Sequence, residues 1–263
     1  MRGLDAAALA DAVYAFTRDS LLEMQRRGLA PKYISAGNEI TNGLLWPLGR
    51  APDFANIAAF AGASLRAARE VLPGSRTMLH LDDGGNVALY RDWFDRYFAA
   101  GGADFDVIGL SYYPFWHGPM AGLSENLAAL SGRWGKDMIV VETAMGFTQE
   151  DYRSYEGLPA DARKGTAARA ELAARVDYPM TPEGQRDFLS DLAGVIRGVP
   201  GGKCLGFVYW EPAWLPVPGS GWATEAALEY IQEPGPGGNE WANLCLFDYE
   251  GRALPALEGL AAL

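Results

Sequence analysis

Short apolar runs alternate with amphipathic stretches along this chain, and that alternation constrains the fold more than any other feature of the sequence. The apolar runs have the length of buried strands, and the stretches between them carry apolar side chains at helical spacing. Strands that alternate with helices form parallel sheets, because parallel neighbours need a crossover connection. The predicted strands are Tyr33–Gly37, Thr77–Leu81, Phe105–Ser111, Met138–Thr143 and Cys204–Trp210.

The intervening stretches predict helices with recognisable ends. Thr181 and Pro182, for example, are a capping residue followed by a first-turn proline. Two long segments lie between the late elements: Ala144–Thr181, with a helical piece near Ala160–Val176, and Leu215–Ala242, which we interpret as a Gly/Pro-rich loop. The predicted helices are Asp5–Arg27, Phe54–Val71, Val87–Ala100, Ser124–Trp134, Thr181–Gly198 and Pro255–Leu263.

These elements predict an α/β fold with a parallel sheet in one domain, residues 1–263. A (β/α)8 barrel typically takes about 250 residues, so the length would allow one, yet only five strand–helix units are found in the 263 residues. The long late loops use the remaining length, and the chain opens on a helix as though its preceding strand were missing. The barrel is therefore expected to be incomplete.

Two of the predicted strands have a glutamate near their carboxyl end. Tyr33–Gly37 leads into Asn38 and Glu39, and Met138–Thr143 contains Glu142. In a parallel sheet the carboxyl ends of the strands meet at one edge, so these glutamates predict a two-carboxylate site. The alternative is that each glutamate is a structural ion-pair partner, but no Lys or Arg is adjacent to either in sequence.

Composition limits the possible partners. The formal net charge is −11, which argues against nucleic acid and anionic membrane surfaces as partners. No stretch reaches the roughly twenty apolar residues of a membrane span, and no signal peptide is visible after Met1. Cys204 and Cys245 lie in apolar stretches, where we expect buried free thiols, although a disulfide is the alternative.

Several segments together resemble glycoside hydrolase family 53, the endo-β-1,4-galactanases, which are clan A (β/α)8 barrels. The most specific stretches are Gly37–Ile40 with Gly43–Pro47, and Tyr209–Trp214. Others in family order are Leu79–Leu81, Asp106–Gly118, Val140–Thr143, Thr181–Gln185 and Leu246–Asp248. In that family the first glutamate follows strand 4 and the second strand 7. The resemblance therefore implies that the chain holds strands 4 to 8 and lacks strands 1 to 3, about 90 residues.

The resemblance implies that Glu39 is the acid/base and Glu142 the nucleophile of a retaining glycosidase acting on galactan. Such an enzyme needs one protonated and one ionised carboxyl group, about 5–5.5 Å apart. We expect Tyr113 to donate a hydrogen bond to Glu142, and the preceding Tyr112 to pack in the core because strand side chains alternate. Asn38 is expected to bind the sugar 2-hydroxyl, or else to form a turn.

The remaining candidates are expected to bind substrate. Trp210 and Trp214 suit stacking on galactose, whereas for Trp46 and Trp116 core packing is an equal alternative. His80 is a candidate substrate ligand or a core histidine. Asp82 is expected to reach a sugar hydroxyl or to cap a turn.

The resemblance also bears on cofactors and location. Some bacterial members bind calcium in late loops, but no Asp/Asn cluster is present there, so we predict no metal and no cofactor. The Ala144–Phe147 segment departs from the usual family sequence, which leaves the nearby subsites open. The expected partner is a polysaccharide, with no nucleic acid or membrane, and the complete protein is expected to be a secreted monomer.

Two rival functions remain open. The first is another clan A glycanase such as a β-mannanase, against which the GLLWP and WEPAW segments argue. The second is an inactive fragment that only binds glycan, because the strand left at the barrel opening would have an unpaired edge. We therefore expect residues 1–263 alone to be unstable or inactive, and the complete gene product to be active.

Overall fold

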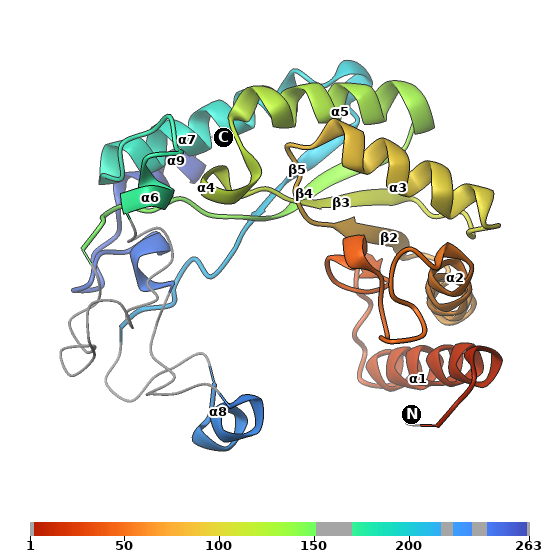
Figure 1. Cartoon of the computed structure of the whole chain (residues 1–263). Coiled ribbons are helices and arrows are strands. Elements are labelled where there is room, and N and C mark those ends of the chain that lie inside the picture. The colour runs from red at the N-terminus through yellow and green to blue at the C-terminus, as the bar shows by residue number, and fades with distance from the viewer. Residues whose placement is uncertain (1–2, 151–169, 217–222, 233–240, 262–263) are drawn as a thin grey trace. The chain divides into compact units, whose positions relative to one another are not determined.

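A computed structural model describes residues 3–150, 170–216, 223–232 and 241–261 (Figure 1). In these residues a five-stranded sheet has the order β1-β2-β3-β4-β5, so each strand neighbours the next one in the chain. β1 pairs with β2 and β2 with β3 in parallel. The strands are β1 (Tyr33–Ser35), β2 (Arg76–Leu81), β3 (Val107–Ser111), β4 (Asp137–Thr143) and β5 (Cys204–Tyr209). This is the strand–helix alternation that the sequence predicts.

The helices begin where the sequence provides capping groups. Asp5, Asp53, Asn86 and Thr181 each accept a hydrogen bond from a backbone N–H of the first turn that follows. The α-helices are α1 (Ala6–Arg26), α2 (Phe54–Val71), α3 (Val87–Ala99), α4 (Pro114–His117), α5 (Met120–Trp134), α6 (Ala170–Ala173), α7 (Pro182–Arg197), α8 (Glu225–Ile231) and α9 (Pro255–Ala261). Short 3₁₀ helices are η1 (Ile40–Asn42), η3 (Pro200–Gly202) and η4 (Ala242–Leu244).

The chain divides into two compact units. The first consists of Met1–Tyr112, Ala121–Val141 and Val199–Gly206. The second consists of Tyr113–Met120, Glu142–Gly198 and Phe207–Leu263. The boundary between the units therefore crosses β4 just before Glu142, and it also crosses β5.

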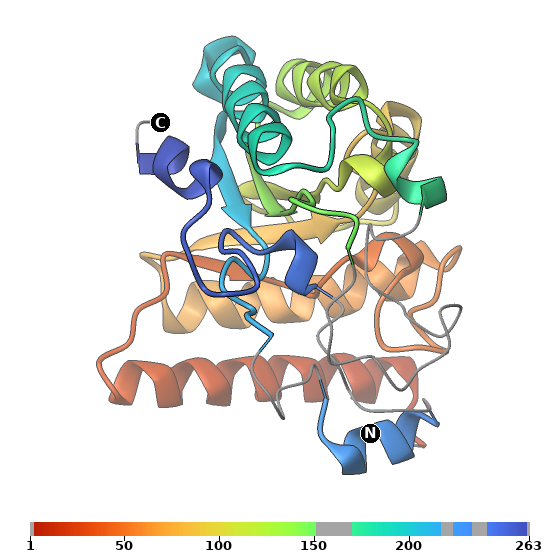
Figure 2. The same cartoon turned by 90° about the vertical axis from the view of Figure 1, so that its left-hand side faces the viewer.

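The core of the first unit contains two buried clusters, one between helices α1 and α2 and one formed by side chains of the strands. α1 and α2 pack side by side (Figure 2), and Leu21 of α1 joins a buried cluster with Ala68, Val71 and Leu72. A second buried cluster contains Met78, Val107 and Ile139, which come from β2, β3 and β4. The partly buried Tyr33 of β1 and Val141 of β4 pack against this cluster. Burial of such apolar side chains contributes about 1.5–3 kcal/mol each. The strand ends in this unit are therefore held by a packed core.

The second unit is organised around buried polar side chains as well as apolar ones. Gln185 of α7 donates from Nε2 to the carbonyl oxygens of Met145, at 2.8 Å, and Cys245, at 2.9 Å. The Tyr209 hydroxyl, at the end of β5, donates to the Leu244 carbonyl at 2.6 Å. α7 also packs against α9. These bonds fix the backbone that follows β4 and β5.

The structure corrects three boundaries by two or more residues and one loop, and it adds the unpredicted helix α4. The helix predicted from Ser124 begins at Met120. β1 ends at Ser35 rather than Gly37, because the backbone bends from Ala36 to Glu39, and β3 begins at Val107 rather than Phe105. The predicted loop Leu215–Ala242 contains α8, whose first turn is capped by the Thr224 hydroxyl. The proline- and glycine-rich sequence on both sides of α8 is the reason why this segment was predicted to be a loop. Most of the predicted helical piece Ala160–Val176 lies outside the described residues.

The structure also provides information on the two cysteines and on the length of the helices. Cys204 and Cys245 are both buried free thiols, as predicted. Among the described residues, no helix combines the length and the apolar character that crossing a membrane requires.

Candidate functional site: two glutamates at the carboxyl ends of strands

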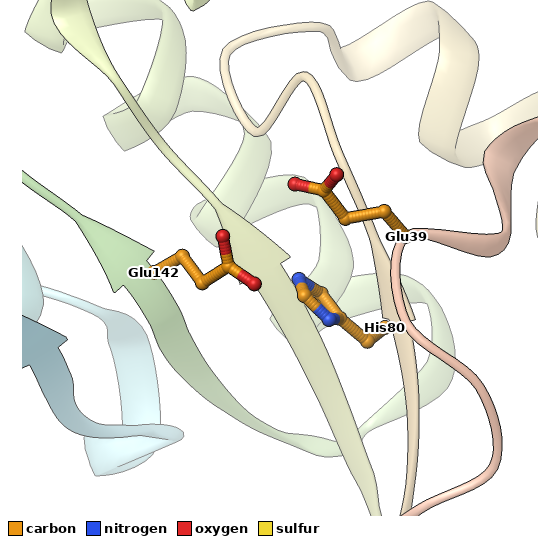
Figure 3. A group of neighbouring side chains, drawn as sticks. All are labelled: Glu39, His80 and Glu142. Carbon is orange, nitrogen blue, oxygen red and sulfur yellow. The ribbon is translucent and has the colours of Figure 1, made fainter. Parts of the chain in front are cut away.

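The candidate catalytic residues come from separate segments that end at the carboxyl ends of neighbouring strands. Glu39 lies in the loop after β1, His80 is the penultimate residue of β2, and Glu142 is the penultimate residue of β4 (Figure 3). Ser111, the last residue of β3, completes the series. Polar side chains thus leave the sheet where parallel α/β folds carry their sites.

Glu39 is positioned by an unusual backbone conformation. Its φ is +46°, in the left-handed region, and it caps η1. Gly37 just before it has a φ of +97°, and a Cβ there would meet the Ile40 side chain at 2.5 Å. Ile40 itself is buried, with 1% exposure. Glycine and a buried isoleucine therefore shape the turn that presents the Glu39 side chain.

A hydrogen-bonded series links Glu39 to β2 and β3. The Ser111 hydroxyl donates to Oε1 of Glu39 at 2.6 Å, and Nε2 of His80 lies 2.8 Å from the same hydroxyl oxygen. Burial lowers the pKa of His80 to about 4, although the nearby Asp82 acts in the opposite direction. His80 is therefore neutral at pH 7. Since Ser111 gives its one proton to Glu39, His80 carries its proton on Nε2 and donates it to Ser111.

The strand ends that carry Ser111 and His80 are held by backbone bonds. The Gly84 N–H donates to the Ser111 carbonyl at 2.9 Å, and Asn126 of α5 donates to the Gly84 carbonyl at 2.8 Å. A Cβ on Gly84 would lie 2.8 Å from that Ser111 oxygen, so the close approach requires glycine. On β2, the Tyr90 hydroxyl donates to the Leu81 carbonyl at 3.0 Å. The Ser111–His80 pair therefore sits on a rigid support.

Glu142 has a different neighbour. Its side chain is 8% exposed, and its Oε2 accepts a hydrogen bond from the Tyr113 hydroxyl at 3.1 Å. The Tyr113 ring is itself buried, and its backbone N–H donates to Nδ1 of His117 at 3.0 Å. The predicted contact between Tyr113 and Glu142 is thus present, and Tyr112 is fully buried as predicted.

An aromatic group accompanies Glu142 in the second unit. Trp116 is 44% exposed, and its ring lies 5.3 Å from that of Tyr113 and 5.9 Å from that of Trp241. Trp241 also lies 5.8 Å from Tyr113. An exposed tryptophan supported by other rings can stack on the apolar face of a sugar. Trp241 was not among the predicted residues.

The tryptophans after β5 lie on a segment that is attached to β4. The Trp210 N–H donates to the Thr143 carbonyl at 2.8 Å, and the Trp210 side chain is 38% exposed. Trp214 is partly buried. Between them, Glu211 has a φ of +53°, and burial raises the pKa of its carboxyl group. This segment therefore offers one exposed ring and one acidic group whose proton is held more tightly than usual.

The remaining candidates lie in the first unit. Trp46 is 56% exposed, donates from Nε1 to the Asn42 carbonyl, and has the Arg50 guanidinium 4.5 Å from its ring. Core packing, one of the two readings of Trp46, is therefore excluded by its exposure. The Asn38 side chain is exposed. Asp82 is partly buried, and its Oδ1 has no hydrogen-bond partner within the described residues.

The electrostatic setting of Glu39 differs from that of an ion-pair partner. In the part of the chain that the structure describes, Glu39 forms no salt bridge; the Ser111 hydroxyl is its hydrogen-bond donor. Glu39, His80 and Glu142 do offer atoms of metal-ligating type. Each has a protein partner at such an atom, however: Ser111 for the first two and Tyr113 for Glu142. The absence of a metal, which was expected from the late loops, stays a prediction.

Three candidates escaped the sequence prediction, and one had a usable signal. Ser111 is a polar residue that ends an apolar strand, which is the pattern that identified Glu39 and Glu142. Glu211 was read only as part of the WEPAW segment, and its left-handed backbone is not visible in a sequence. Trp241 follows a stretch without periodicity, so nothing in the sequence indicated its contacts with Trp116.

A sheet with strands in chain order, helical connections and two glutamates at carboxyl strand ends defines a class: the glycoside hydrolases of the (β/α)8 fold. The chain belongs to glycosyl hydrolase family 53, whose family model matches residues 2–260.

Relatives and solved structures agree with this membership. The chain is 36% identical to an uncharacterised protein of Niallia circulans, covering 95% of this chain and 65% of that protein. It is 30% identical to the endo-beta-1,4-galactanase of Bacillus subtilis, covering 94% of this chain and 58% of that enzyme. The chain thus spans less than two thirds of the length of these relatives.

The fold agrees as well. The family 53 catalytic domain of Ignisphaera aggregans superposes with a TM-score of 0.85 at 33% identity, covering 98% of this chain and 66% of that domain. One of two fungal beta-1,4-galactanases superposes with a TM-score of 0.73 at 28% identity, covering 98% of this chain and 70% of the other. The five-stranded sheet is therefore part of a (β/α)8 barrel fold.

Proposed function

We propose that the protein cleaves β-1,4-galactosidic bonds within galactan, with retention of configuration, using Glu39 as acid/base and Glu142 as nucleophile. The observation that carries the proposal is the position of the two glutamates on one sheet. Each lies at the carboxyl end of a strand, and each accepts a hydrogen bond from a neutral hydroxyl, Ser111 or Tyr113, in the described structure. For Glu39, which forms no salt bridge within the described residues, this pattern argues against a structural ion-pair role.

In the first step of the proposed reaction, a carboxylate oxygen of Glu142 attacks the anomeric carbon. A covalent galactosyl–enzyme ester forms as the glycosidic C–O bond breaks, and Glu39 transfers its proton to the departing oxygen. The departing chain leaves with a free hydroxyl, and Glu39 becomes a carboxylate. The negative charge of Glu142 is consumed in the ester bond.

In the second step, the Glu39 carboxylate removes a proton from water, whose oxygen attacks the same anomeric carbon. The ester bond to Glu142 breaks, the sugar regains a hydroxyl with its original configuration, and both carboxyl groups return to their starting protonation states. Two inversions at one carbon give net retention. No cofactor is needed, because every proton that leaves one group arrives on another.

The protonation states follow from the surroundings of each glutamate. A hydrogen bond donated by Tyr113 favours ionised Glu142, because a charged acceptor binds a donor more strongly. The proposed reaction requires Glu39 to start in its protonated form, as the acid of the pair. The difference supports the assignment of Glu142 as the nucleophile.

We further infer that β1 to β5 correspond to strands 4 to 8 of the family barrel. Glu39 then follows strand 4 and Glu142 lies on strand 7, as in the family pattern. In this register Asn38 contacts the 2-hydroxyl of the reacting sugar, and the exposed rings of Trp210 and Trp116 stack on neighbouring sugars. Trp214, Trp46 and Asp82 are assigned to more distant sugars.

The substrate class rests on the relatives. Those of Bacillus subtilis and Thermothelomyces thermophilus are named as endo-β-1,4-galactanases, the second an arabinogalactan endo-β-1,4-galactanase. Xylanases share the fold at 16% identity and a TM-score of 0.60, which supports no shared substrate. We therefore propose a pectic galactan as the substrate, a monomeric enzyme and a secreted location.

The test uses the complete gene product that contains these residues. Incubation with galactan is expected to release short galacto-oligosaccharides, and Glu39→Ala and Glu142→Ala are each expected to remove this activity. A panel of galactan, mannan and xylan distinguishes the rival glycanases. Activity that survives both substitutions, or a preference for mannan, would refute the assignment.

Trapping separates catalysis from mere binding. A 2-deoxy-2-fluoro galactoside with an activated leaving group slows the second step, so the ester should accumulate on Glu142 and appear in peptide mass spectra. If the protein binds galactan by affinity electrophoresis but never releases product or forms an adduct, it is a binding protein.

A further inference from the structure

The Ser111–His80 pair has a feature that the two-glutamate reaction does not use. Ser111 is fully buried and His80 is 3% exposed, yet both are polar, and their hydrogen bonds form a series that ends at Glu39. A buried hydroxyl and imidazole cost free energy unless they are paired. Both are paired, and the last acceptor in the line is the Glu39 carboxyl group.

The direction of the bonds determines which Glu39 oxygen is engaged. Ser111 donates to Oε1 at 2.6 Å, and Nε2 of neutral His80 lies 2.8 Å from the Ser111 oxygen, to which it donates in the tautomer with the proton on Nε2. Oε1 therefore acts as an acceptor whether Glu39 is ionised or protonated, and a proton on Glu39 resides on Oε2. A free carboxyl group would distribute its proton between the two oxygens and rotate about its last torsion.

We propose that Ser111, oriented by His80, is a positioning residue that holds Oε1 of Glu39 so that Oε2 carries the catalytic proton. This inference rests on the proposed role of Glu39 as acid/base. In the first step the proton leaves Oε2 for the glycosidic oxygen, and in the second Oε2 takes a proton from water. Oε1 keeps its bond to Ser111 throughout, and that bond strengthens each time Glu39 becomes charged.

The supporting contacts fit a positioning role rather than direct contact with sugar. Ser111 is inaccessible, and its carbonyl is fixed by the Gly84 N–H. His80 faces Ser111 with Nε2 and has Asp82 nearby. A precise carboxyl orientation matters because general acid catalysis requires the proton to lie within hydrogen-bond reach of the departing oxygen.

The main test compares two substrates in the complete gene product. Ser111→Ala is expected to lower kcat on galactan by about 10–100-fold, with KM changed by less than about threefold, because general acid help contributes about 10²–10⁴-fold in total. An aryl galactobioside with a strongly acidic phenol needs little protonation of its leaving group. Formation of the galactosyl ester from that substrate, measured as the phenol burst, should therefore fall by less than about threefold.

The pH profile gives a second readout. An acid whose ionised form loses a hydrogen-bond donor has a higher pKa. In Ser111→Ala, the alkaline limb of the pH profile of kcat/KM should therefore move to higher pH. The other titratable groups close to this chain of bonds are His80, Asp82, Asp83 and Tyr90, together with Glu142 in the proposed reaction. They are unchanged in the variant, so the shift reports the lost hydroxyl.

A matched pair of variants at position 111 distinguishes loss of the hydroxyl group from a folding defect. Ser111→Thr and Ser111→Val differ only in a hydroxyl group against a methyl group, so Thr should retain far more galactan activity than Val at equal melting temperature. Thr77 provides the control, since its buried hydroxyl donates to the Asp106 carboxylate at 2.8 Å near the opposite end of β2. Thr77→Val should alter stability without changing the ratio of activities on the two substrates.

The outcomes separate the two proposals. If Glu39→Gln leaves galactan cleavage intact, the proposed function fails. If Glu39→Gln abolishes cleavage but Ser111→Ala slows both substrates equally, or leaves galactan turnover unchanged, the positioning role of Ser111 is wrong.

Discussion

In the first unit, carboxylates at the two ends of the strands have different kinds of partner. At the amino end, Asp137 is paired with Arg76 at 2.7 Å and with Lys203 at 3.2 Å. At the carboxyl end, Glu39 is held by the neutral Ser111 hydroxyl. The cationic neighbours favour the ionised form of Asp137, whereas the proposed role of Glu39 requires it to gain and lose a proton. The amino end thus holds an ion pair, and the carboxyl end holds the proposed catalytic acid.

The pKa values follow the same division. Burial acts to raise the pKa of Asp137, but hydrogen bonds and attraction from Arg76 and Lys203 outweigh it, so this pKa lies below its ordinary value. The same opposition lowers the pKa of Asp106, which accepts bonds from the N–H and hydroxyl of Thr77. His80, near the carboxyl end, is instead kept neutral by burial.

The largest effect should come from exchanging each carboxylate for an amide of equal size. Glu39→Gln is expected to lower kcat on galactan by about 10³-fold or more while the melting temperature changes little, because the lost proton belongs to the reaction. Asp137→Asn should do the reverse, with kcat intact in the folded protein. Kinetics and thermal unfolding on both variants test this, and equal losses of activity in the two would contradict the division.

The next effect concerns pH. His80 binds a proton below about pH 4 in the native state but near pH 6.5 when unfolded, so falling pH over this interval favours unfolding. A difference of about 2.5 pH units corresponds to about 3 kcal/mol, present in full above pH 6.5 and lost as the pH falls to about 4. Denaturant unfolding of the wild type and of His80→Gln at pH 7 and pH 4.5 measures it. The variant should lose less stability than the wild type on acidification, and parallel curves would show that His80 is not the cause.

The smallest effect is at the amino end. Asp137→Asn should lower the free energy of unfolding at pH 7 by about 1–2 kcal/mol, since Asp137 is partly buried between two cations. Because the folded pKa of Asp137 is depressed, its contribution is present above the unfolded pKa and is lost as pH falls through the folded one. Wild type and variant should therefore converge in stability as the pH falls below the depressed folded pKa of Asp137. A gap that stays constant throughout acidification would contradict the ion-pair explanation.

Much of the fold was predictable because strand and helix periods are local. The bounds of α2 match the prediction, and β4 differs by one residue, since apolar spacing and capping groups mark both. The end of β1 was missed because the left-handed turn at Glu39 depends on packing of Ile40, which no local pattern reveals. α8 was missed because its helical stretch is short and lies between glycine- and proline-rich neighbours.

The site was predictable only where a strand pattern points to one residue. Glu39 and Glu142 stand at the ends of apolar runs, and strand alternation predicted the burial of Tyr112 beside Tyr113, which donates to Glu142. Ser111 stood in the same position but was overlooked, because a serine alone carries no acid or base chemistry. Its importance arises from the distances to His80 and Glu39, which are tertiary facts.

The left-handed backbone of Glu39 has a consequence for how such a protein can change over time. Outside glycine and a few short polar residues, this conformation costs about 1–2 kcal/mol, so glycine at position 39 would relax the chain. Directed evolution for heat resistance alone would reward that replacement and discard the proposed acid. Screens of this kind on this protein therefore need a galactan-cleavage step in every round, because the selected variants are otherwise expected to be stable and inactive.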